Sequence, residues 1–518
     1  MINKISRCLI SVSDKSGLDA VLEILRKFNI KTISTGGTYK YIKEKNYECT
    51  EISSYTSSPE ILDGRVKTLH PKIHGGILNV RQNKIHQNQL KDNKIQNIDL
   101  VIVNLYPFEN KLKEKVIFED MIENIDIGGP SMLRSAAKNF KDVTVIPSSS
   151  FYKELIEELK SNDGATSLDF RKKMANETFN ETAFYDSLIA NWMNNQNNIK
   201  FPQKKTIPGK LIKKLRYGEN PHQESCVFEI VNENKGFSNL KQVQGKELSH
   251  NNYLDSFNAY SLVNDFNVNE KVCAIIKHNN PCGCSLNDNG LLAFQNALDG
   301  DPTSAFGGVV AFNFEINDEI ALKLTEKFYE VVLCPKINNK AKSILATKKN
   351  LRVLEYNLPE KTQSLSATFM QKTFLLQDEN IYLSNEKGFQ VVTKAKPTTD
   401  EIKNLLFANQ VCKHVKSNAI VICNKNKTLG IGCGQTSRVG SSKIACESAK
   451  KNFPKQILGS SAASDAFFPF ADGLESLVKL GVKSIIQPGG SIKDKEVIEA
   501  ADKAGVSMVF TGVRNFKH

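Results

Sequence analysis

The stretch Val272-Cys-Ala-Ile-Ile-Lys-His-Asn-Asn-Pro-Cys-Gly283 decides how this chain is interpreted. Its first five residues are apolar and mostly β-branched, which predicts a buried strand. We expect Pro281 and Gly283 to turn the chain after that strand. Lys277 and His278 should then lie at its carboxyl end, where open α/β sheets bind their ligands. The stretch therefore predicts a site that holds a cation beside a proton carrier.

A Lys-His pair at a strand end also fits an ordinary surface turn, because short motifs often mislead. Length and composition narrow the choice. The 518 residues suggest about three domains, and 40% hydrophobic with 8% aromatic residues is typical of a globular protein. No apolar run approaches the roughly 18 residues of a membrane helix, and residues 1–12 mix Lys, Arg and Asn among apolar residues, unlike a signal peptide. We expect a cytoplasmic protein without a membrane partner.

The net charge of +13, from 69 Lys+Arg against 56 Asp+Glu, raises the question of a polyanionic partner. Most lysines are scattered, and no basic stripe with interleaved aromatic residues is present. We therefore expect anionic metabolites and no nucleic acid. A basic RNA-binding protein remains the non-enzymatic alternative.

Cys282 and Cys284 form the one close pair among the eleven cysteines. The pair is similar to half of the Pro-Cys-x-x-Cys zinc site of nucleobase deaminases, but it is one residue short and no His-x-Glu precedes it. Because a zinc site needs three or four ligands, we expect no zinc. A zinc deaminase remains the alternative enzyme class.

The N-terminal part shows strands that end in polar loops. A strand over 5–12 leads into Ser13-Asp14-Lys15, and a strand near 31–33 leads into Ser34-Thr-Gly-Gly-Thr38. Two glycines before a helix let backbone N–H groups approach an anion. A third strand, over 100–105, ends at Tyr106. These loops predict one anion site at one edge of a parallel sheet.

The segment Gly64-Arg-Val-Lys-Thr-Leu-His-Pro-Lys-Ile-His-Gly-Gly76 places three cations and two histidines, His70 and His74, in one expected loop. Such a density of positive charge costs electrostatic energy unless an anion binds. A solvated basic loop is the alternative. Further on, Asp126-Ile-Gly-Gly129 should open a helix whose Arg134 and Lys138 share a face.

Two polar segments divide the chain. Lost helical periodicity near residues 194–209 predicts a first boundary and the polar stretch 394–400 a second, giving expected domains 1–198, 199–395 and 396–518. The third part repeats the pattern of the second. Its alternating glycines Gly430, Gly432 and Gly434 indicate either close backbone packing or a ligand lying flat on a strand. Phe467, Phe468 and Phe470 suit a core or a stacking platform equally.

Taken together, these motifs resemble the bifunctional family that joins a 5-aminoimidazole-4-carboxamide ribonucleotide (AICAR) formyltransferase to an inosine monophosphate (IMP) cyclohydrolase. The motifs stand in the family's order: Ser-Val-Ser-Asp-Lys15, Ser-Thr-Gly-Gly-Thr38, Gly-Arg-Val-Lys-Thr-Leu-His-Pro71, Asn-Leu-Tyr-Pro-Phe108, Asp-Ile-Gly-Gly129, Arg-Tyr-Gly-Glu-Asn-Pro-His-Gln223, Lys-His-x-x-Pro-Cys-Gly283, Ser-Ala-Phe-Gly-Gly308 and Ser-Asp-Ala-Phe-Phe-Pro-Phe470. Any one is weak alone, whereas the series is specific.

The resemblance implies an α/β protein with a doubly wound N-terminal domain similar to methylglyoxal synthase. It also implies a transformylase of two α/β subdomains similar to cytidine deaminase but without zinc. The implied reactions are formyl transfer from 10-formyltetrahydrofolate to AICAR and dehydrative ring closure of formyl-AICAR to IMP. A homodimer with transformylase sites across the dimer contact is implied as well. The sequence does not decide whether a monovalent cation binds.

The family's transformylase residues carry over to matching positions. His278 matches the base and Lys277 the lysine that stabilises the transition state. The AICAR contacts resemble Arg216, Tyr217, Gly307, Glu330, Asn418, Phe467 and Arg514. The formyl-folate contacts resemble Arg438, Val439, Asp472, Ser491 and Ile492. Ala471, beside the expected folate pocket, departs from the Arg or Pro of many relatives.

In the cyclohydrolase, Lys138 resembles the family's proton-transfer lysine. The nucleotide contacts resemble Ser13, Asp14, Lys15, Thr35, Gly36, Gly37, Thr38, Arg65, Val66, Lys67 and Thr68, with Val103, Asn104, Tyr106, Asp126 and Ile127 around the base.

The chemistry of these side chains suits both reactions. The exocyclic amine of AICAR is a poor nucleophile, so its attack on a formyl carbon needs a base for the proton and a cation for the oxyanion. His278 and Lys277 can supply them. Ring closure forms another alkoxide, for which Lys67, Lys138 and Tyr106 can donate hydrogen bonds while Asp126 orients the amide. The sequence therefore predicts two separate active sites.

Overall fold

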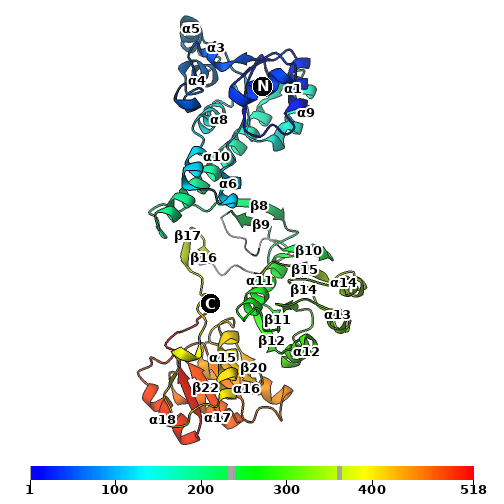
Figure 1. Ribbon diagram of the computed structural model, residues 1–518, viewed down its shortest axis with the longest axis vertical. Helices are drawn as coiled ribbons and strands as arrows, with labels where there is room; N and C mark the ends of the chain where they lie inside the picture. Colours follow the sequence, from blue (N-terminus) through cyan, green and yellow to red (C-terminus); the bar gives the residue numbers. More distant parts are fainter. Residues whose placement is uncertain (1, 232–236, 238–239, 359–364) are drawn as a thin grey trace. The chain divides into compact units, whose positions relative to one another are not determined.

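The computed structural model of the protein describes residues 2–231, 237, 240–358 and 365–518. The chain forms two compact units, residues 1–210 with 228–233 and residues 211–227 with 234–518 (Figure 1). Strands β8 (Gly209–Lys214) and β9 (Cys226–Ile230) lie where the chain passes from one unit to the other. The polar segment expected to break the periodicity near residue 194 is helical up to Gln196. The predicted domain boundaries themselves stay predictions.

The first unit is a doubly wound α/β domain. Its strands are β1 (Ile2–Lys4), β2 (Arg7–Val12), β3 (Lys31–Ser34), β4 (Thr50–Glu51), β5 (Leu100–Asn104), β6 (Thr144–Ile146) and β7 (Ala165–Ser167). Its helices are α1 (Leu18–Lys27), α2 (Gly36–Glu44), α3 (Ile52–Thr56), α4 (Pro71–Leu78), α5 (Lys84–Asp92), α6 (Phe108–Glu114), α7 (Phe118–Glu123), α8 (Gly128–Lys138), α9 (Tyr152–Ser161) and α10 (Leu168–Gln196), with 3-10 turns at Leu62–Gly64 and Ser149–Phe151.

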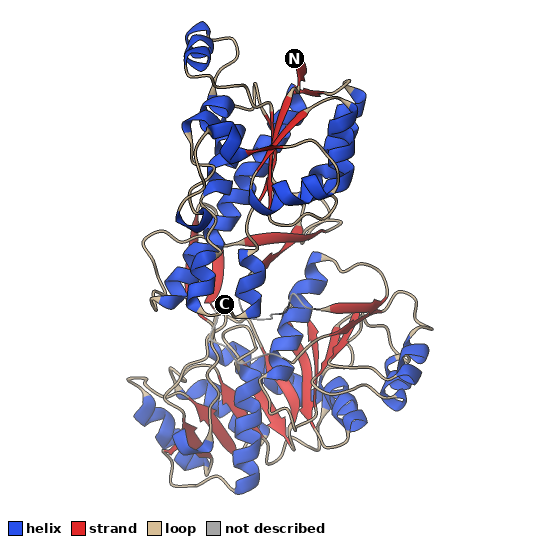
Figure 2. Cartoon of the chain, turned by 45° about the horizontal axis from the view of Figure 1, so that its top comes forward, coloured by secondary structure: helices blue, strands red, loops and turns tan. Residues whose placement is uncertain are grey.

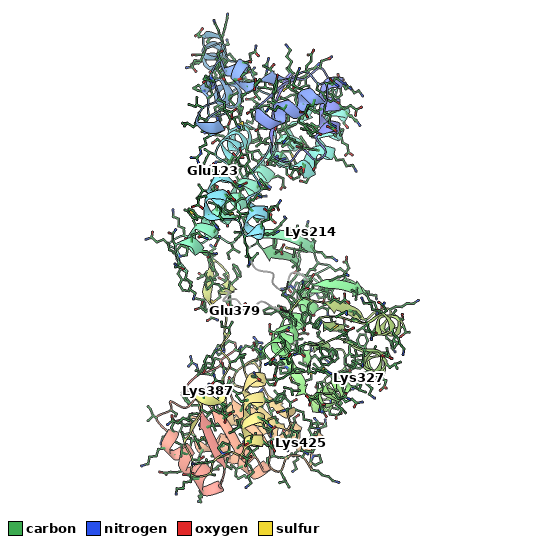
Figure 3. The ribbon with its side chains drawn as sticks, viewed as in Figure 1. Glu123, Lys214, Lys327, Glu379, Lys387 and Lys425 are labelled. Carbon is green, nitrogen blue, oxygen red and sulfur yellow. The ribbon has the colours of Figure 1, made fainter. Side chains whose placement is uncertain are left out.

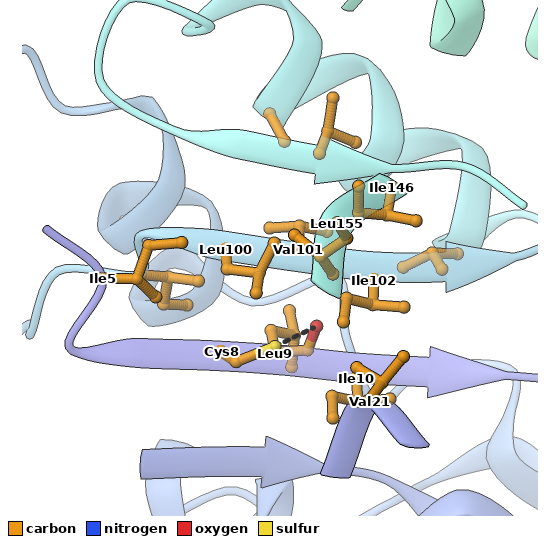
Figure 4. Close-up of a cluster of buried hydrophobic side chains, with 14 of the residues drawn as sticks. Ile5, Cys8, Leu9, Ile10, Val21, Leu100, Val101, Ile102, Ile146 and Leu155 are labelled. Carbon is orange, nitrogen blue, oxygen red and sulfur yellow. Dashed lines mark hydrogen bonds between the residues drawn. The ribbon is translucent and has the colours of Figure 1, made fainter. Parts of the chain in front are cut away.

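The central sheet of this unit has the order β4-β3-β2-β5-β6, and all its pairs are parallel. Strands β2 and β5 are almost wholly apolar because helices cover both faces of the sheet. Figure 4 shows their buried side chains, among them Leu9, Ile10 and Val101, packed with Val21 and Leu155 from helices. The strand order reverses between β2 and β5, so a ligand crevice is expected at the carboxyl ends of these two strands.

The second unit contains the large sheet. Its strands are β10 (Lys241–Gln244), β11 (Val272–Lys277), β12 (Asn280–Leu286), β13 (Val309–Phe312), β14 (Val331–Cys334), β15 (Arg352–Glu355), β16 (Leu365–Met370), β17 (Thr373–Asp378), β18 (Gln390–Val391), β19 (Ile420–Asn424), β20 (Lys427–Gly432), β21 (Ser461–Ser464), β22 (Ser484–Gln487) and β23 (Ser507–Phe510). Its helices are α11 (His250–Asn264), α12 (Gly290–Gly300), α13 (Asp318–Leu324), α14 (Asn339–Leu345), α15 (Thr399–Cys412), α16 (Arg438–Asn452), α17 (Ala471–Leu480) and α18 (Asp494–Ala504), with a 3-10 turn at Glu386–Gly388.

The sheet of twelve strands consists of two halves with the same topology. The order is β10-β15-β14-β13-β11-β12 followed by β20-β19-β21-β22-β23-β18. In each half a hairpin pairs with an antiparallel strand, two parallel strands follow, and an antiparallel strand forms the edge. The halves join where β12 pairs with β20. The predicted fold class is confirmed, although β18, which precedes the expected boundary after residue 395, pairs within the second half.

Helices cover both faces of this sheet (Figure 2). One continuous core joins α11 and α15 to both halves. On the other face, α12 to α14 pack on the first half and α16 to α18 on the second. Nowhere in the described ranges does a helix combine the length and apolar character that crossing a membrane requires.

The hairpin of β11 and β12 corrects one expectation from the sequence. The predicted strand is present, but the chain turns at His278 and Asn279, whose φ angles are +53° and +64°. Pro281 and Gly283 lie inside β12, opposite Ile276 and Ile275. A two-residue loop with both residues left-handed is a type I′ turn, which matches the twist of paired strands. Asn279, at the second position, suits that turn. The sequence interpretation placed the turn at Pro281 and Gly283 instead and missed this signal.

The alternating glycines of β20 serve packing. A Cβ at Gly430 would lie 2.1 Å from the Ala445 carbonyl oxygen, and one at Gly432 would meet Ser441 of the same helix, α16. Glycine is therefore required where the backbone of α16 approaches the strand. Of the three phenylalanines that follow β21, Phe468 is buried in the core, whereas Phe467 and Phe470 are exposed.

Candidate active sites

A cavity of about 570 Å³ opens at the carboxyl ends of β2, β3 and β5 in the first unit. This is the position that the reversed strand order predicts. Its volume lies within the range of small-molecule sites. The lining residues are Ser11, Val12, Ser13, Lys15, Thr35, Gly37, Thr38, Gly64, Arg65, Lys67, Thr68, Asn104, Tyr106, Ile122, Glu123, Ile125, Asp126, Ile127, Gly128, Gly129 and Met132.

Side-chain hydrogen bonds to the backbone hold the wall of this cavity. Asn104 accepts from the backbone N–H groups of Ser13 at 2.5 Å and Asp14 at 3.1 Å, and its amide donates to the Asp14 carbonyl at 2.6 Å. The Thr38 hydroxyl donates to the Val12 carbonyl at 2.9 Å. The loop after β2 is thus fixed from both neighbouring strands before any ligand binds.

The cavity offers positive groups that are paired with carboxylates. Arg65 is hydrogen-bonded to Glu123, which Figure 3 labels, and Lys67 Nζ lies 3.5 Å from Glu60. The Thr35 hydroxyl, just before α2, is buried and has no hydrogen-bond partner within the described part of the chain. A helix N-terminus with an unused donor and two nearby cations is suited to a phosphate, which would compete with the two glutamates.

Asp126 supplies the acceptor on the other side of the cavity. Burial raises the pKa of its carboxyl, while hydrogen bonds from the backbone of Gly129 and Tyr106 and the charge of Lys67 oppose that rise. The Gly129 N–H lies 2.8 Å from Asp126 Oδ1, so the side chain is fixed at the start of α8. An oriented carboxylate facing an ammonium and the partly exposed Tyr106 can hold an amide and stabilise an alkoxide.

The structure brings most of the predicted cyclohydrolase residues to this cavity, but five do not line it. These are Asp14, Gly36, Val66, Val103 and Lys138. Val103 is buried inside β5. Lys138 is exposed at the last residue of α8, about 15 Å along the helix axis from Gly128 at 1.5 Å per residue.

The expected basic loop is only partly a loop. Arg65 and Lys67 reach the cavity, but α4 starts at Pro71, and His70 caps it by accepting from the Lys72 N–H at 3.1 Å. His74 Nδ1 lies 3.0 Å from the Ser135 hydroxyl, and burial lowers its pKa. Pro at the first helical position was the available signal for this helix. Nothing in the sequence marked Glu60 or Glu123 as counter-ions.

A second cavity, of about 370 Å³, lies in the second unit beside the turn of β11 and β12. Lys277, His278, Asn280, Pro281, Cys282, Asp301, Ser304, Ile431, Cys433 and Ser448 line it. His278 is exposed, and Lys277 Nζ donates to the Phe306 carbonyl at 2.8 Å. An ammonium has three N–H donors, so two remain for a ligand. Burial raises the pKa of the Cys282 thiol to about 12, which keeps this wall uncharged.

The strand directions place the predicted transformylase residues along one edge of the large sheet. Gly307 and Glu330 precede β13 and β14, whose amino ends lie beside the carboxyl end of β11. At the same edge, Asn418 precedes β19, which is antiparallel to β20 and β21. The segments after β20, β21, β22 and β23 carry the others: Arg438, Val439, Phe467, Asp472, Ser491, Ile492 and Arg514. None of these ten lines the cavity beside Lys277.

Several of these side chains already have partners within the unit. Arg438 is buried and donates to Asp465, to the Ser464 hydroxyl at 2.7 Å and to Asn418 Oδ1 at 2.7 Å. Glu330 accepts from Arg352 at 2.6 Å. Arg438 thus fixes Asn418 at the edge.

Other predicted residues stay open to ligands. Arg216 and Tyr217 follow β8 and contact each other, with the guanidinium 5.6 Å from the ring centre. The Arg514 guanidinium lies 4.3 Å from the Phe516 ring centre. The side chain of Ile492 is fully exposed. These residues offer exposed side-chain surface to a ligand.

The chain is therefore an enzyme-like α/β protein in which one described cavity suits a phosphate and another holds a lysine beside a histidine. The family model described as AICARFT/IMPCHase bienzyme matches residues 136–448, and an MGS-like domain matches residues 17–131. The chain belongs to the AICARFT/IMPCHase bienzyme family. It is a bifunctional formyltransferase and cyclohydrolase that carries out the last two steps of IMP synthesis.

Curated relatives match along nearly their whole length. The bifunctional purine biosynthesis protein PurH of Prochlorococcus marinus (strain MIT 9515) is 47% identical, over 98% of this chain and 99% of the relative. The protein of the same name from Bradyrhizobium diazoefficiens is 44% identical, and that from Caldicellulosiruptor saccharolyticus is 46% identical, each over 99% of both chains. Among solved structures, ForH is 29% identical, covering 36% of this chain and 95% of its own, with a TM-score of 0.32. The alternatives of a zinc deaminase and an RNA-binding protein are thereby set aside.

Proposed function

We propose that formyl transfer takes place beside the turn of β11 and β12, with His278 as base and Lys277 as the cation for the oxyanion. The observation that supports this proposal is that the exposed His278 lies next to Lys277 in the cavity wall. The hydrogen bond from Lys277 Nζ to the Phe306 carbonyl holds the ammonium there. The amine of AICAR attacks the formyl carbon and its proton passes to the imidazole. The bond between the formyl carbon and N10 of the folate then breaks, and tetrahydrofolate leaves with a proton on that nitrogen. The two unused N–H donors of Lys277 stabilise the oxygen that becomes negative.

We further propose that ring closure takes place in the cavity of the first unit. The nucleotide phosphate binds at the start of α2 near Thr35 and displaces Glu60 and Glu123 from the two cations. Asp126 then accepts from the carboxamide nitrogen that attacks the formyl group. Lys67 and Tyr106 donate to the resulting alkoxide before water leaves. Lys138 does not line this cavity. If it transfers a proton during ring closure, it must do so from outside the cavity.

The formyl donor is proposed to be 10-formyltetrahydrofolate, because the family takes its formyl group from a folate. Its contacts are proposed at Arg438, Val439, Asp472, Ser491 and Ile492, on the edge that carries Lys277. The remaining AICAR contacts are proposed at the other edge residues and at Arg216 and Tyr217. Both metabolic partners are small molecules of the cytoplasm, where we place the enzyme.

We also propose a homodimer. The hairpin of β16 and β17 exposes Phe369 by 70%, Met370 by 45%, Phe374 by 39% and Leu375 by 58%. An isolated two-stranded hairpin is marginally stable in water, and an apolar patch of this kind marks a protein interface. The family resemblance implies, in addition, that transformylase sites are completed across the dimer contact.

The decisive experiment separates the two activities in the full chain. AICAR with 10-formyltetrahydrofolate tests formyl transfer, and supplied formyl-AICAR tests ring closure. Lys277→Ala should abolish formyl transfer and leave ring closure at the native rate, and Lys67→Ala should do the reverse. If either variant is folded and loses both activities together, the assignment of two separate sites is wrong.

Phe369→Ser with Leu375→Ser should shift the dimer to monomer in light scattering.

A further inference from the structure

The turn that carries His278 adopts a backbone conformation that non-glycine residues rarely occupy. His278 and Asn279 both have positive φ angles, +53° and +64°. Non-glycine residues keep a left-handed backbone conformation only where the surrounding structure stabilises it. The groups that hold this turn therefore decide where the imidazole lies.

Helix α11 holds the turn through two side chains one turn apart. Asp255 Oδ1 accepts from the Asn279 N–H at 2.7 Å, and Asn258 Nδ2 donates to Asn279 Oδ1 at 2.8 Å. The second bond needs the amide of Asn258 in one of its two orientations, with nitrogen toward the turn. A flipped amide would place two acceptors face to face.

The C-terminal segment selects that orientation together with the Leu254 carbonyl, which accepts from Asn258 Nδ2 at 3.0 Å. Lys517 Nζ donates to Asn258 Oδ1 at 2.6 Å and to the His414 carbonyl at 3.2 Å. Because an ammonium only donates, it binds the oxygen of Asn258 and leaves the nitrogen facing Asn279. The backbone of Lys517 is held in turn, since its N–H donates to the Ser417 hydroxyl at 3.1 Å and its carbonyl accepts from the Ser417 N–H at 2.9 Å.

We propose that Lys517 is a positioning residue for formyl transfer, which fixes the His278 turn through Asn258 and Asn279. The inference rests on the proposed role of His278 as base. Lys517 acts through Asn258, by keeping one amide in the orientation that the turn requires.

The surroundings of Lys517 give the proposal a pH signature. Burial, together with the nearby charges of Lys416 and Lys413, lowers the pKa of its ammonium to about 8, and Asp265 opposes that change. His414 contributes its backbone carbonyl, and its imidazole is bound to Asp265 at 2.6 Å. Above about pH 8 the neutral amine loses its charge-assisted bond to Asn258 and can accept from the flipped amide.

The test measures kcat and KM for formyl transfer across this pH range in the full chain. Lys517→Met should lower kcat about tenfold, change KM for AICAR less than about twofold and leave ring closure unchanged. Lys503→Met, on the exposed face of α18, is the matched control and should behave as the native chain. Lys517→Arg, whose guanidinium stays charged, should keep kcat and lose the decline that the native enzyme shows above about pH 8.

A double variant separates positioning from general destabilisation. If Lys517 acts through Asn258, combining Asn258→Ala with Lys517→Met should lower kcat no more than Asn258→Ala alone. Losses that multiply, a native kcat in Lys517→Met, or an alkaline decline retained in Lys517→Arg would each overturn the proposal. A native rate in His278→Ala would instead overturn the proposed base, so the two failures are distinguishable.

Discussion

The two halves of the large sheet contain the same hairpin, yet only the turn of the first hairpin lies at a candidate active site. In the first half the turn is His278–Asn279, and in the second it is Lys425–Asn426, with φ angles of +49° and +54°. Both turns are held by a side chain of the preceding helix. Asp255 Oδ1 accepts from the Asn279 N–H at 2.7 Å, and Asn404 Oδ1 accepts from the Asn426 N–H at 3.1 Å.

The difference lies in charge and in placement. The first turn has a carboxylate beneath a histidine, a lysine before it and a cavity beside it. The second has a neutral amide and the exposed Lys425, which Figure 3 labels. The antiparallel pairing of β11, β12, β20 and β19 places this turn at the opposite end of the strands. The comparison teaches that the fold supplies a rigid turn twice, whereas the chemistry depends on a few side chains added to one of them.

The largest effect should come from replacing the first residue of the catalytic turn, His278, with alanine, and Lys425 of the second turn provides the matched control. His278→Ala should slow formyl transfer about a thousandfold, because the base for the amine proton is lost. Lys425→Ala should leave the rate unchanged. Rates of formyl-AICAR formation check both variants, with ring closure by the first unit as the internal control. Equal losses in both would mean that the turn matters only as structure.

Matched glycines should behave alike in the two halves. Gly283 in β12 and Gly430 in β20 occupy corresponding positions, and a Cβ would meet the Ala297 oxygen at 2.0 Å or the Ala445 oxygen at 2.1 Å. Alanine at either position should lower the free energy of unfolding by about 2 kcal/mol through overpacking. Urea denaturation measures the change. An effect at only one glycine would break the structural equivalence.

Exchanging the helix side chains should reveal what the carboxylate adds. Asp255→Asn preserves an oxygen acceptor for the Asn279 N–H, as in the second half, but removes the negative charge near His278. We expect formyl transfer to fall about tenfold, since that charge favours the imidazolium formed when His278 takes the proton. The reciprocal Asn404→Asp should leave formyl transfer unchanged. A native rate in Asp255→Asn would show that only its hydrogen bond is used.

The smallest effect concerns the contact between the two halves. Asp265, at the end of α11, accepts from Lys413 at 2.7 Å and from His414 at 2.6 Å, both at the end of α15. Burial lowers the pKa of His414 below its ordinary 6.5, although Asp265 opposes that change and the charges of Lys413 and Lys517 support it. The unfolded chain then binds more protons as the pH falls below 6.5, so folding stability should decrease there. His414→Gln should flatten this decline by less than about 1 kcal/mol in urea denaturation.

The sequence predicted much of the scaffold for clear physical reasons. Buried parallel strands read as apolar runs, so β2, β5 and β11 were located within a residue or two at one or both ends. The polar loops after β2, β3 and β5 predicted one anion site because parallel strands end at a common edge. The place of the turn at His278 was missed, since Pro281 and Gly283 dominated the local pattern.

What the sequence could not show are contacts between distant segments. Glu60 and Glu123 pair with Lys67 and Arg65 through the folding of separate loops. Lys517 reaches Asn258 across more than half of the second unit's sequence. No local spacing encodes such partners. The roles assigned to the transformylase residues by family resemblance stay predictions, because the cavity beside Lys277 includes few of them.

The left-handed backbone at His278 has a consequence for how this enzyme can change. Glycine adopts that conformation without the steric cost that a Cβ imposes. Replacing His278 with glycine would therefore relieve the backbone strain of the turn. The same substitution would remove the imidazole and abolish formyl transfer. A histidine kept at this position would therefore be selected for catalysis, although glycine suits the backbone conformation better.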